Sequence, residues 1–131
     1  MWTICLLIVV SISGLDWVRN RASTSGTPSI VNLSLGGFFS LVLNAAVNYL
    51  ASKGIHVVVA AGNSGLPANL YSPAGASGAI AVCATDISDT LTPWSNWGTP
   101  LTICAPGQDI ISSWNTDDTV GQIYCIFWIA R

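Results

Sequence analysis

The chain has 131 residues, the length of one domain or of part of one. Hydrophobic residues make up 51% of the sequence and charged residues only 8%, which excludes a disordered segment and is unusual for a complete soluble domain. The net charge is -2 and the four basic residues form no stripe, so we expect no nucleic-acid partner.

The amino-terminal apolar run Ile4–Val10 is far shorter than the roughly 20 residues needed to cross a bilayer, so we predict no membrane span. A signal peptide cleaved near Ser11–Ser13 is an alternative, but no Lys or Arg precedes the run, as such a peptide requires. Small residues from Ala22 to Pro28 predict a loop that closes this amino-terminal part.

The segment from Ile30 to Ala60 has the pattern of a strand, a helix and a second strand. Apolar and polar residues alternate from Ile30 to Leu35, which predicts a strand with one buried face. The nearly continuous apolar run Ile55–Ala60 predicts a parallel strand that is covered on both faces. The whole segment spans about 31 residues, the length of one βαβ unit, so we expect a right-handed crossover and a parallel sheet.

A helix should connect these two strands. Ser40 is a suitable N-cap and Gly54 a suitable C-terminal residue, which predicts a helix from Leu41 to about Ser52. Its apolar face should contain the residues at helical spacing, Val42, Ala45, Ala46, Tyr49 and Leu50.

The second half of the chain predicts two further strands separated by loops. A loop rich in Gly, Ser, Pro and Asn covers Gly62–Ser77, and a short apolar strand follows at Ala79–Ala84. After an irregular polar and aromatic stretch, another strand is expected at Leu101–Cys104, before a turn at Ala105–Gly107. Nothing in the sequence marks a second domain, so we expect one α/β unit.

The four cysteines, Cys5, Cys83, Cys104 and Cys125, include no Cys-x-x-Cys pair, and the single histidine makes a zinc site a poor interpretation. Cys83 and Cys104 each lie in an apolar segment typical of a strand, so we expect buried free thiols. A Cys83–Cys104 disulfide is the alternative if the protein is secreted.

The change from an apolar run to small residues at Val57–Ser64 places Asn63 at the carboxyl end of a predicted parallel strand. Open α/β sheets bind their ligands at that end. The side-chain NH2 of an asparagine can donate a hydrogen bond to the oxyanion that forms when a nucleophile attacks an amide carbonyl. A turn-forming role is the simpler interpretation of an isolated Asn after Gly, so the neighbouring motifs decide between the two.

Short motifs follow one another along the chain at Asn32–Gly37, Ala60–Asn63, Tyr71–Ala74, Ser95–Gly98 and Ala105–Gly107. Because these motifs occur in this order, the chain resembles the subtilisin-like serine proteases (subtilase family, peptidase S8), and it is most similar to the proteinase K-like branch. The resemblance covers about residues 13–118 and implies a partial catalytic domain with a three-layer α/β fold, a mainly parallel sheet between helices, incomplete at both ends. Residues 1–12 and 121–131 are atypical, and we expect both ends to be artefacts of the gene model.

The resemblance implies a peptide or protein substrate and a role for seven residues. In the family, the motif that matches Asn32–Gly37 lines the substrate cleft and pairs with the backbone of the bound peptide. The residues of this substrate edge are here Ser34, Leu35 and Gly36. The second motif forms one wall of the S1 pocket and the oxyanion hole, and its wall residues are Ala60, Ala61 and Gly62. Asn63 would be the oxyanion donor and the catalytic residue that this chain supplies.

The three family motifs that hold the catalytic Asp, His and Ser have no match in the sequence. Asp16 matches instead a helix that follows the catalytic His region, and His56, the only histidine, is expected to be structural. The nucleophile motif should come shortly after Trp114, but the segment Asn115–Val120 does not contain it. We therefore expect no protease activity from the chain as written.

The family commonly binds calcium, but Thr102 occupies about the position of a ligating Asp, and a hard cation depends on carboxylate oxygens. We expect no metal site and no cofactor, and we interpret acidic residues such as Asp117 and Asp118 as solvated loop residues. Asn32 begins a glycosylation sequon, but its place in a predicted strand argues against modification.

These features are relevant to three candidate functions. The favoured one is part of a secreted, extracellular subtilisin-like endopeptidase that hydrolyses peptide bonds. The alternative is a non-catalytic remnant that binds peptides or interferes with a partner through the Ser34–Gly36 edge. A nucleotide-binding α/β protein is disfavoured, because the sequence has no Gly-rich phosphate loop.

Overall fold

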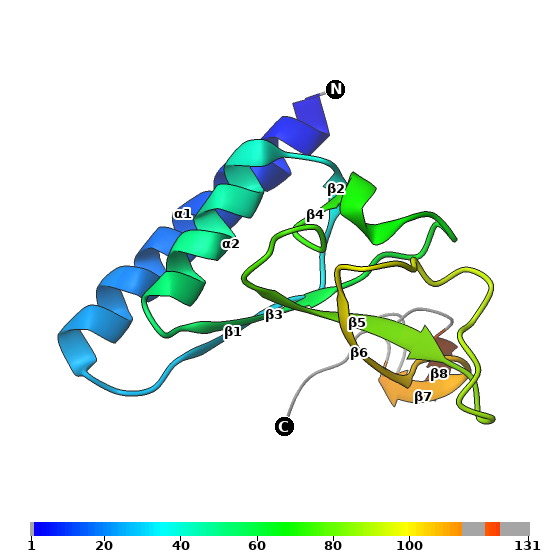
Figure 1. Cartoon of the computed structure of the whole chain (residues 1–131). Helices are drawn as coiled ribbons and strands as arrows, with labels where there is room; N and C mark the ends of the chain where they lie inside the picture. Colours follow the sequence, from blue (N-terminus) through cyan, green and yellow to red (C-terminus); the bar gives the residue numbers. More distant parts are fainter. Residues whose placement is uncertain (1, 114–119, 124–131) are drawn as a thin grey trace.

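The computed structural model describes residues 2–113 and 120–123. Its main sheet has four parallel strands in the order β1-β3-β5-β6, namely β1 (Ile30–Leu33), β3 (His56–Ala60), β5 (Ala79–Thr85) and β6 (Leu101–Pro106). The predicted α/β class with a parallel sheet is therefore confirmed, and Figure 1 shows the helices packed together beside the strands.

The remaining elements of the described ranges are two helices, one short 3-10 helix and two small antiparallel pairs. The helices are α1 (Trp2–Ser25) and α2 (Leu41–Ser52), with the 3-10 helix η1 at Ala68–Leu70. The pairs are β2 (Gly37–Phe38) with β4 (Tyr71–Ser72), and β7 (Ile110–Ser113) with β8 (Val120–Ile123).

One apolar cluster joins both helices to the same face of the sheet. Leu15 of α1 and Val47 of α2 belong to this cluster together with Val57 and Val59 of β3, which are almost fully buried. The two helices lie side by side in Figure 1, so the described residues contain the sheet and one helical layer. Burying this apolar area is the main force that holds α1 and α2 on the sheet.

The bounds predicted for α2 are confirmed, but its predicted apolar face is largely wrong. Ser40 is the N-cap, and its side-chain oxygen accepts a hydrogen bond from the Leu43 amide at 3.3 Å. Apolar residues occur around most of this helix, so spacing alone does not select a face. The exposed residues include Val42, Ala45 and Tyr49, whereas the buried residues are Leu43, Asn44, Val47 and Leu50.

The predicted loop at Ala22–Pro28 is wrong in its first half, because α1 continues to Ser25. Thr24 and Ser25 donate their side-chain hydroxyls to carbonyls of the preceding turn, including that of Ala22. Such bonds let small polar residues remain helical, although the same residues are common in loops. The loop begins at Gly26.

Two strand ends also differ from the prediction. β1 ends at Leu33 rather than Leu35, and β6 extends through Ala105 and Pro106, which were predicted as a turn. A proline is tolerated there because β6 is an edge strand of the four-stranded sheet, where a residue without an N–H need not remove an interstrand hydrogen bond.

Cys83 and Cys104 form a disulfide, so the expected free thiols at these positions are wrong. The two residues are direct partners in the register between β5 and β6, which brings their side chains together. That register could not be read from strand-like segments 21 residues apart in the sequence.

Within the described ranges, no helix is both long and apolar enough to cross a membrane. The predicted departure from the family pattern at residues 115–119, the acidic pair at 117 and 118, and most of the atypical segment 121–131 lie outside the described residues.

Candidate functional site

All seven predicted site residues line one cavity of about 190 Å³, which we name the site cavity. It lies just beyond the carboxyl ends of β1 and β3, where parallel sheets place their ligand sites. Its walls come from three separate parts of the chain, and the lining residues are Ser34, Leu35, Gly36, Ala60, Ala61, Gly62, Asn63, Ser64, Tyr71, Ser72 and Ala74.

The pairing of β1 with β3 explains why the two motifs meet. Leu33, the last residue of β1, is opposite Val59 near the end of β3. Both strands run in the same direction, so the segments that follow them, Ser34–Gly36 and Ala61–Asn63, leave the sheet at the same edge. Sequence order and strand register together therefore assemble the site cavity.

The loop that carries Asn63 is fixed on its strand side and exposed at its tip. Ala61 is fully buried, and its amide donates a hydrogen bond of 2.9 Å to the Val82 carbonyl of β5. Gly62 has φ of +105°, a conformation that residues with a side chain rarely adopt. Asn63 and Ser64 follow as exposed residues. The Asn63 side chain, which carries an amide N–H donor, is thus exposed to solvent.

The opposite wall is tied to the start of α2. A Cβ added at Gly36 would lie only 3.1 Å from the Ser72 carbonyl oxygen, so the two backbones approach closely at a position that only glycine fits well. The Ser72 hydroxyl accepts from the Ser40 amide at 2.8 Å and donates to the Ser40 carbonyl at 3.2 Å. Phe38 and Tyr71 stack with their ring centroids 5.6 Å apart, which adds side-chain packing to the β2–β4 pair.

Sequence reasoning assigned no role to Asn96, whose fully buried side chain lies against the loop that carries Asn63. The signal available was the Ser95–Gly98 motif, which marked the segment without indicating what its asparagine contacts. The same holds for Tyr71 and Ser72, which belong to a recognised motif and line the site cavity.

The other candidate residues lie away from the site cavity. His56 begins β3, and at about 3.3 Å per residue it is roughly 13 Å from Ala60 at the other end of that strand. Thr102 accepts a hydrogen bond from the Ala81 amide at 3.2 Å and so takes part in the sheet. Asp86 accepts from the amides of Ser88 and Thr90, as in a local turn.

Among residues 2–113 and 120–123, no three His, Cys, Asp or Glu side chains are grouped so that they could hold a metal ion.

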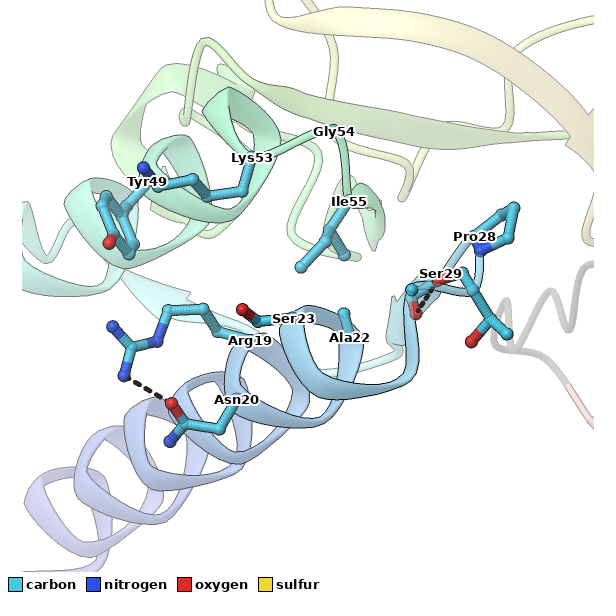
Figure 2. Close-up of a pocket in the computed structure, with 12 residues that line it drawn as sticks. Arg19, Asn20, Ala22, Ser23, Pro28, Ser29, Tyr49, Lys53, Gly54 and Ile55 are labelled. Carbon is cyan, nitrogen blue, oxygen red and sulfur yellow. Dashed lines mark hydrogen bonds between the residues drawn. The ribbon is translucent and has the colours of Figure 1, made fainter.

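A larger cavity of about 710 Å³ lies at the carboxyl ends of the two helices, and we name it the helix-end cavity (Figure 2). Its cations are already engaged: Arg19 lies 2.9 Å from Asp16, and Lys53 lies over the ring of Tyr49. A hydrogen bond with Tyr49 and the charge of Asp16 raise the pKa of Arg19. This cavity adjoins Ile55, just before β3, and is therefore at the amino end of the strands.

Comparison with known proteins gives a consistent family. The model of the subtilase family, peptidase S8, matches residues 10–127. The chain is 45% identical over 107 residues to a cuticle-degrading serine protease of Orbilia oligospora, covering 82% of this chain and 25% of that protein. It is 43% identical over 110 residues to proteinase T of Parengyodontium album, covering 82% of this chain and 38% of that protein.

Two further matches agree with these. An extracellular serine proteinase of Thermus sp. (strain Rt41A) is 44% identical over 108 residues, which cover 82% of this chain and 26% of that protein. The crystal structure of a cold-adapted subtilisin-like serine proteinase superposes with a TM-score of 0.78 at 39% identity, covering 87% of this chain and 40% of that one. The chain thus spans between a quarter and two fifths of the length of these relatives.

Proposed function

Because this chain belongs to the subtilase family of serine proteases, we propose that it supplies the substrate edge and the oxyanion donor of an endopeptidase. The observation that carries the proposal is the convergence of Ser34–Gly36 and Ala60–Asn63 on one cavity at the carboxyl ends of β1 and β3. The parallel pairing of β1 with β3 brings the two motifs to the carboxyl edge of the sheet, where open α/β sheets bind their ligands, and this placement supports a common function.

In the proposed reaction, a peptide lies along Ser34–Gly36 in an extended conformation and bonds to its backbone. The side chain before the scissile bond enters the space beside Ala60–Gly62, a segment that consists of small residues. A serine nucleophile, activated by a histidine that an aspartate orients, attacks the carbonyl carbon. Asn63 donates its side-chain N–H to the oxygen as negative charge develops on it.

The catalytic Asp, His and Ser are not among the residues that we assign to this chain. The position of His56 at the far end of β3 supports this view, because a general base must reach the nucleophile within hydrogen-bonding distance. We therefore propose that the 131-residue chain has no peptidase activity of its own and that activity depends on the residues of the missing motifs.

We further propose an extracellular location. One relative is named an extracellular serine proteinase, and the Cys83–Cys104 disulfide is of the kind that persists in oxidising compartments.

A segment exchange tests the proposal. Residues 30–113 of this chain replace the matching segment of proteinase T, whose own sequence supplies the remainder of its domain. The proposal predicts hydrolysis of a chromogenic peptide amide by the exchanged protease and none by the isolated chain. An exchanged protein that folds but does not hydrolyse the peptide would contradict the proposed role, and so would activity of the isolated chain.

The second candidate is a module that binds peptides without cleaving them, and the formed site cavity without a neighbouring histidine supports it. Titration of the isolated chain with an uncleaved peptide distinguishes the two. Binding by the isolated chain together with an inactive exchanged protease would favour the binding module.

A further inference from the structure

Asn96 lies in the loop between β5 and β6 and is 0% exposed. Its amide oxygen accepts hydrogen bonds from the backbone amides of Ser64 at 3.0 Å and Leu66 at 3.2 Å. Its amide nitrogen donates to the Ala61 carbonyl at 2.9 Å, and its backbone N–H donates to the Gly62 carbonyl at 2.8 Å. These four bonds hold the chain on both sides of Asn63.

The contact leaves no space for a side chain at position 62. A Cβ added to Gly62 would overlap the Nδ2 atom of Asn96, and the positive φ of Gly62 already disfavours other residues. Gly62 and Asn96 are therefore complementary: the glycine lets the amide approach the backbone, and the amide fixes the turn that the glycine makes.

The neighbouring residue reinforces the contact. The indole N–H of Trp97 donates to the Gly65 carbonyl at 3.0 Å, and its backbone N–H donates to the Leu66 carbonyl at 3.2 Å. The segment that holds Asn96 thus follows the Asn63 loop over several residues, 30 or more positions away in the sequence. An oxyanion donor needs this kind of support, because a misplacement of about 1 Å can cost on the order of 10²-fold in rate.

We propose that Asn96 is a positioning residue that sets the place of the Asn63 side chain in the oxyanion hole. The proposal rests on the proposed function of Asn63. The role needs an amide, since one planar group must accept two backbone N–H bonds and donate to a carbonyl. A carboxylate at this position accepts the same two bonds but repels the Ala61 carbonyl, whereas its protonated form can donate to that carbonyl.

That difference provides a test by NMR on the full 131-residue chain. In Asn96→Asp, the backbone and side-chain amide resonances of Asn63 should be displaced from the wild-type positions at neutral pH and should return towards them in acid. Burial and the Ala61 carbonyl raise the pKa of the introduced carboxyl group and the two backbone N–H donors lower it, so the midpoint of the return measures the pKa at this position. Among the described residues, none of the hydrogen-bond partners of Asn96 is titratable. A titration of the wild-type chain is the control for Asp86 and Asp89, which lie in the same loop.

The matched control is Asn48→Asp. The Asn48 side chain also accepts a backbone amide from a distant loop, that of Gly78 at 2.8 Å, but it does not line the site cavity. Asn63 resonances that stay at wild-type positions in Asn96→Asp at every pH would overturn the proposal, and so would an equal displacement in Asn48→Asp. If Asn96→Asp does not fold, amide exchange in the wild-type chain decides: the proposal requires Ser64 and Leu66 to exchange slowly, and exchange at the rate of an unstructured peptide overturns it.

Kinetics in the exchanged protease give a second readout. Asn96→Asp should lower kcat by about 10- to 100-fold at neutral pH and change KM by less than about twofold, because the oxyanion forms only in the transition state. A change in KM alone would contradict a positioning role. If the exchanged protease without this substitution is inactive, the proposed function fails, while the NMR titration still decides the role of Asn96.

Discussion

The site cavity and the helix-end cavity lie at opposite ends of the same parallel strands and differ in what their walls offer a ligand. The helix-end cavity has about 710 Å³ and the site cavity about 190 Å³. The larger one contains cations that neighbouring groups already engage, such as Arg19 beside Asp16. The smaller one has an exposed amide on a loop that buried hydrogen bonds fix. Position at the carboxyl ends of the strands and a loop fixed by Asn96, rather than volume, therefore distinguish the cavity with a proposed chemical role.

The largest expected effect is the loss of the oxyanion donor. Asn63→Ala in the exchanged protease should lower kcat by about 10²- to 10³-fold, a magnitude taken from the corresponding asparagine of subtilisin, itself a member of this family. The steady-state rate on a peptide amide measures it, with Asn48→Ala as the control that should retain activity. A loss below tenfold would remove the distinction between the two cavities.

The disulfide should affect stability without affecting the site cavity, which neither cysteine lines. Replacing both Cys83 and Cys104 with Ser opens a loop of 21 residues and should lower the free energy of unfolding by about 3 kcal/mol. Urea denaturation of the chain measures the change, and reductant should have no further effect on the double variant. An unchanged denaturation midpoint would show that the β5–β6 pair is held without the disulfide.

A smaller effect separates backbone strain from steric overlap in the Asn63 loop. Gly62 and Gly98 have similar φ values, +105° and +110°, but a Cβ at Gly98 would meet only open space and Pro100 at 3.9 Å. Gly62→Ala should therefore reduce the free energy of unfolding by more than Gly98→Ala does, by at least about 1 kcal/mol. Equal losses in urea denaturation would mean that Asn96 does not restrict position 62.

The smallest effect is expected in the helix-end cavity. Lys53→Ala removes an exposed cation whose contact is with the ring of Tyr49. Loss of the exposed side chain should change the free energy of unfolding by less than about 0.5 kcal/mol, and loss of the cation–π contact should add a decrease of about 0.5 kcal/mol. The kcat of the exchanged protease should stay within about twofold. A tenfold loss of kcat would mean that this cavity also affects catalysis.

Local sequence signals predicted much of the fold. The N-cap Ser40 gave the correct start of α2, and the apolar run before Ala60 gave β3. The apolar face of α2 was predicted incorrectly, because Val42 and Tyr49 are exposed whereas Val47 and even the polar Asn44 are buried. The choice between such faces depends on α1 and the sheet, which periodicity within one helix does not contain.

The site, like the fold, has features that the sequence predicted and features that it did not. Motifs at strand ends brought the seven predicted residues to one cavity, because a parallel sheet aligns its carboxyl ends. The contacts of Asn96 could not be predicted, since its partners lie 30 to 35 residues away in the sequence. For a similar reason the sequence favoured free thiols over the Cys83–Cys104 disulfide, because the disulfide depends on the register between β5 and β6.

The most direct test of the central claim compares two ligands of the exchanged protease. A peptide aldehyde forms a tetrahedral adduct whose oxygen occupies the oxyanion hole, whereas an uncleaved peptide of the same sequence occupies only the substrate edge. Asn63→Ala should weaken aldehyde binding by about the same factor as it lowers kcat, on the order of 10², and leave the Kd of the uncleaved peptide within about twofold. Equal weakening of both ligands, or of neither, would contradict the assignment of Asn63 as the oxyanion donor.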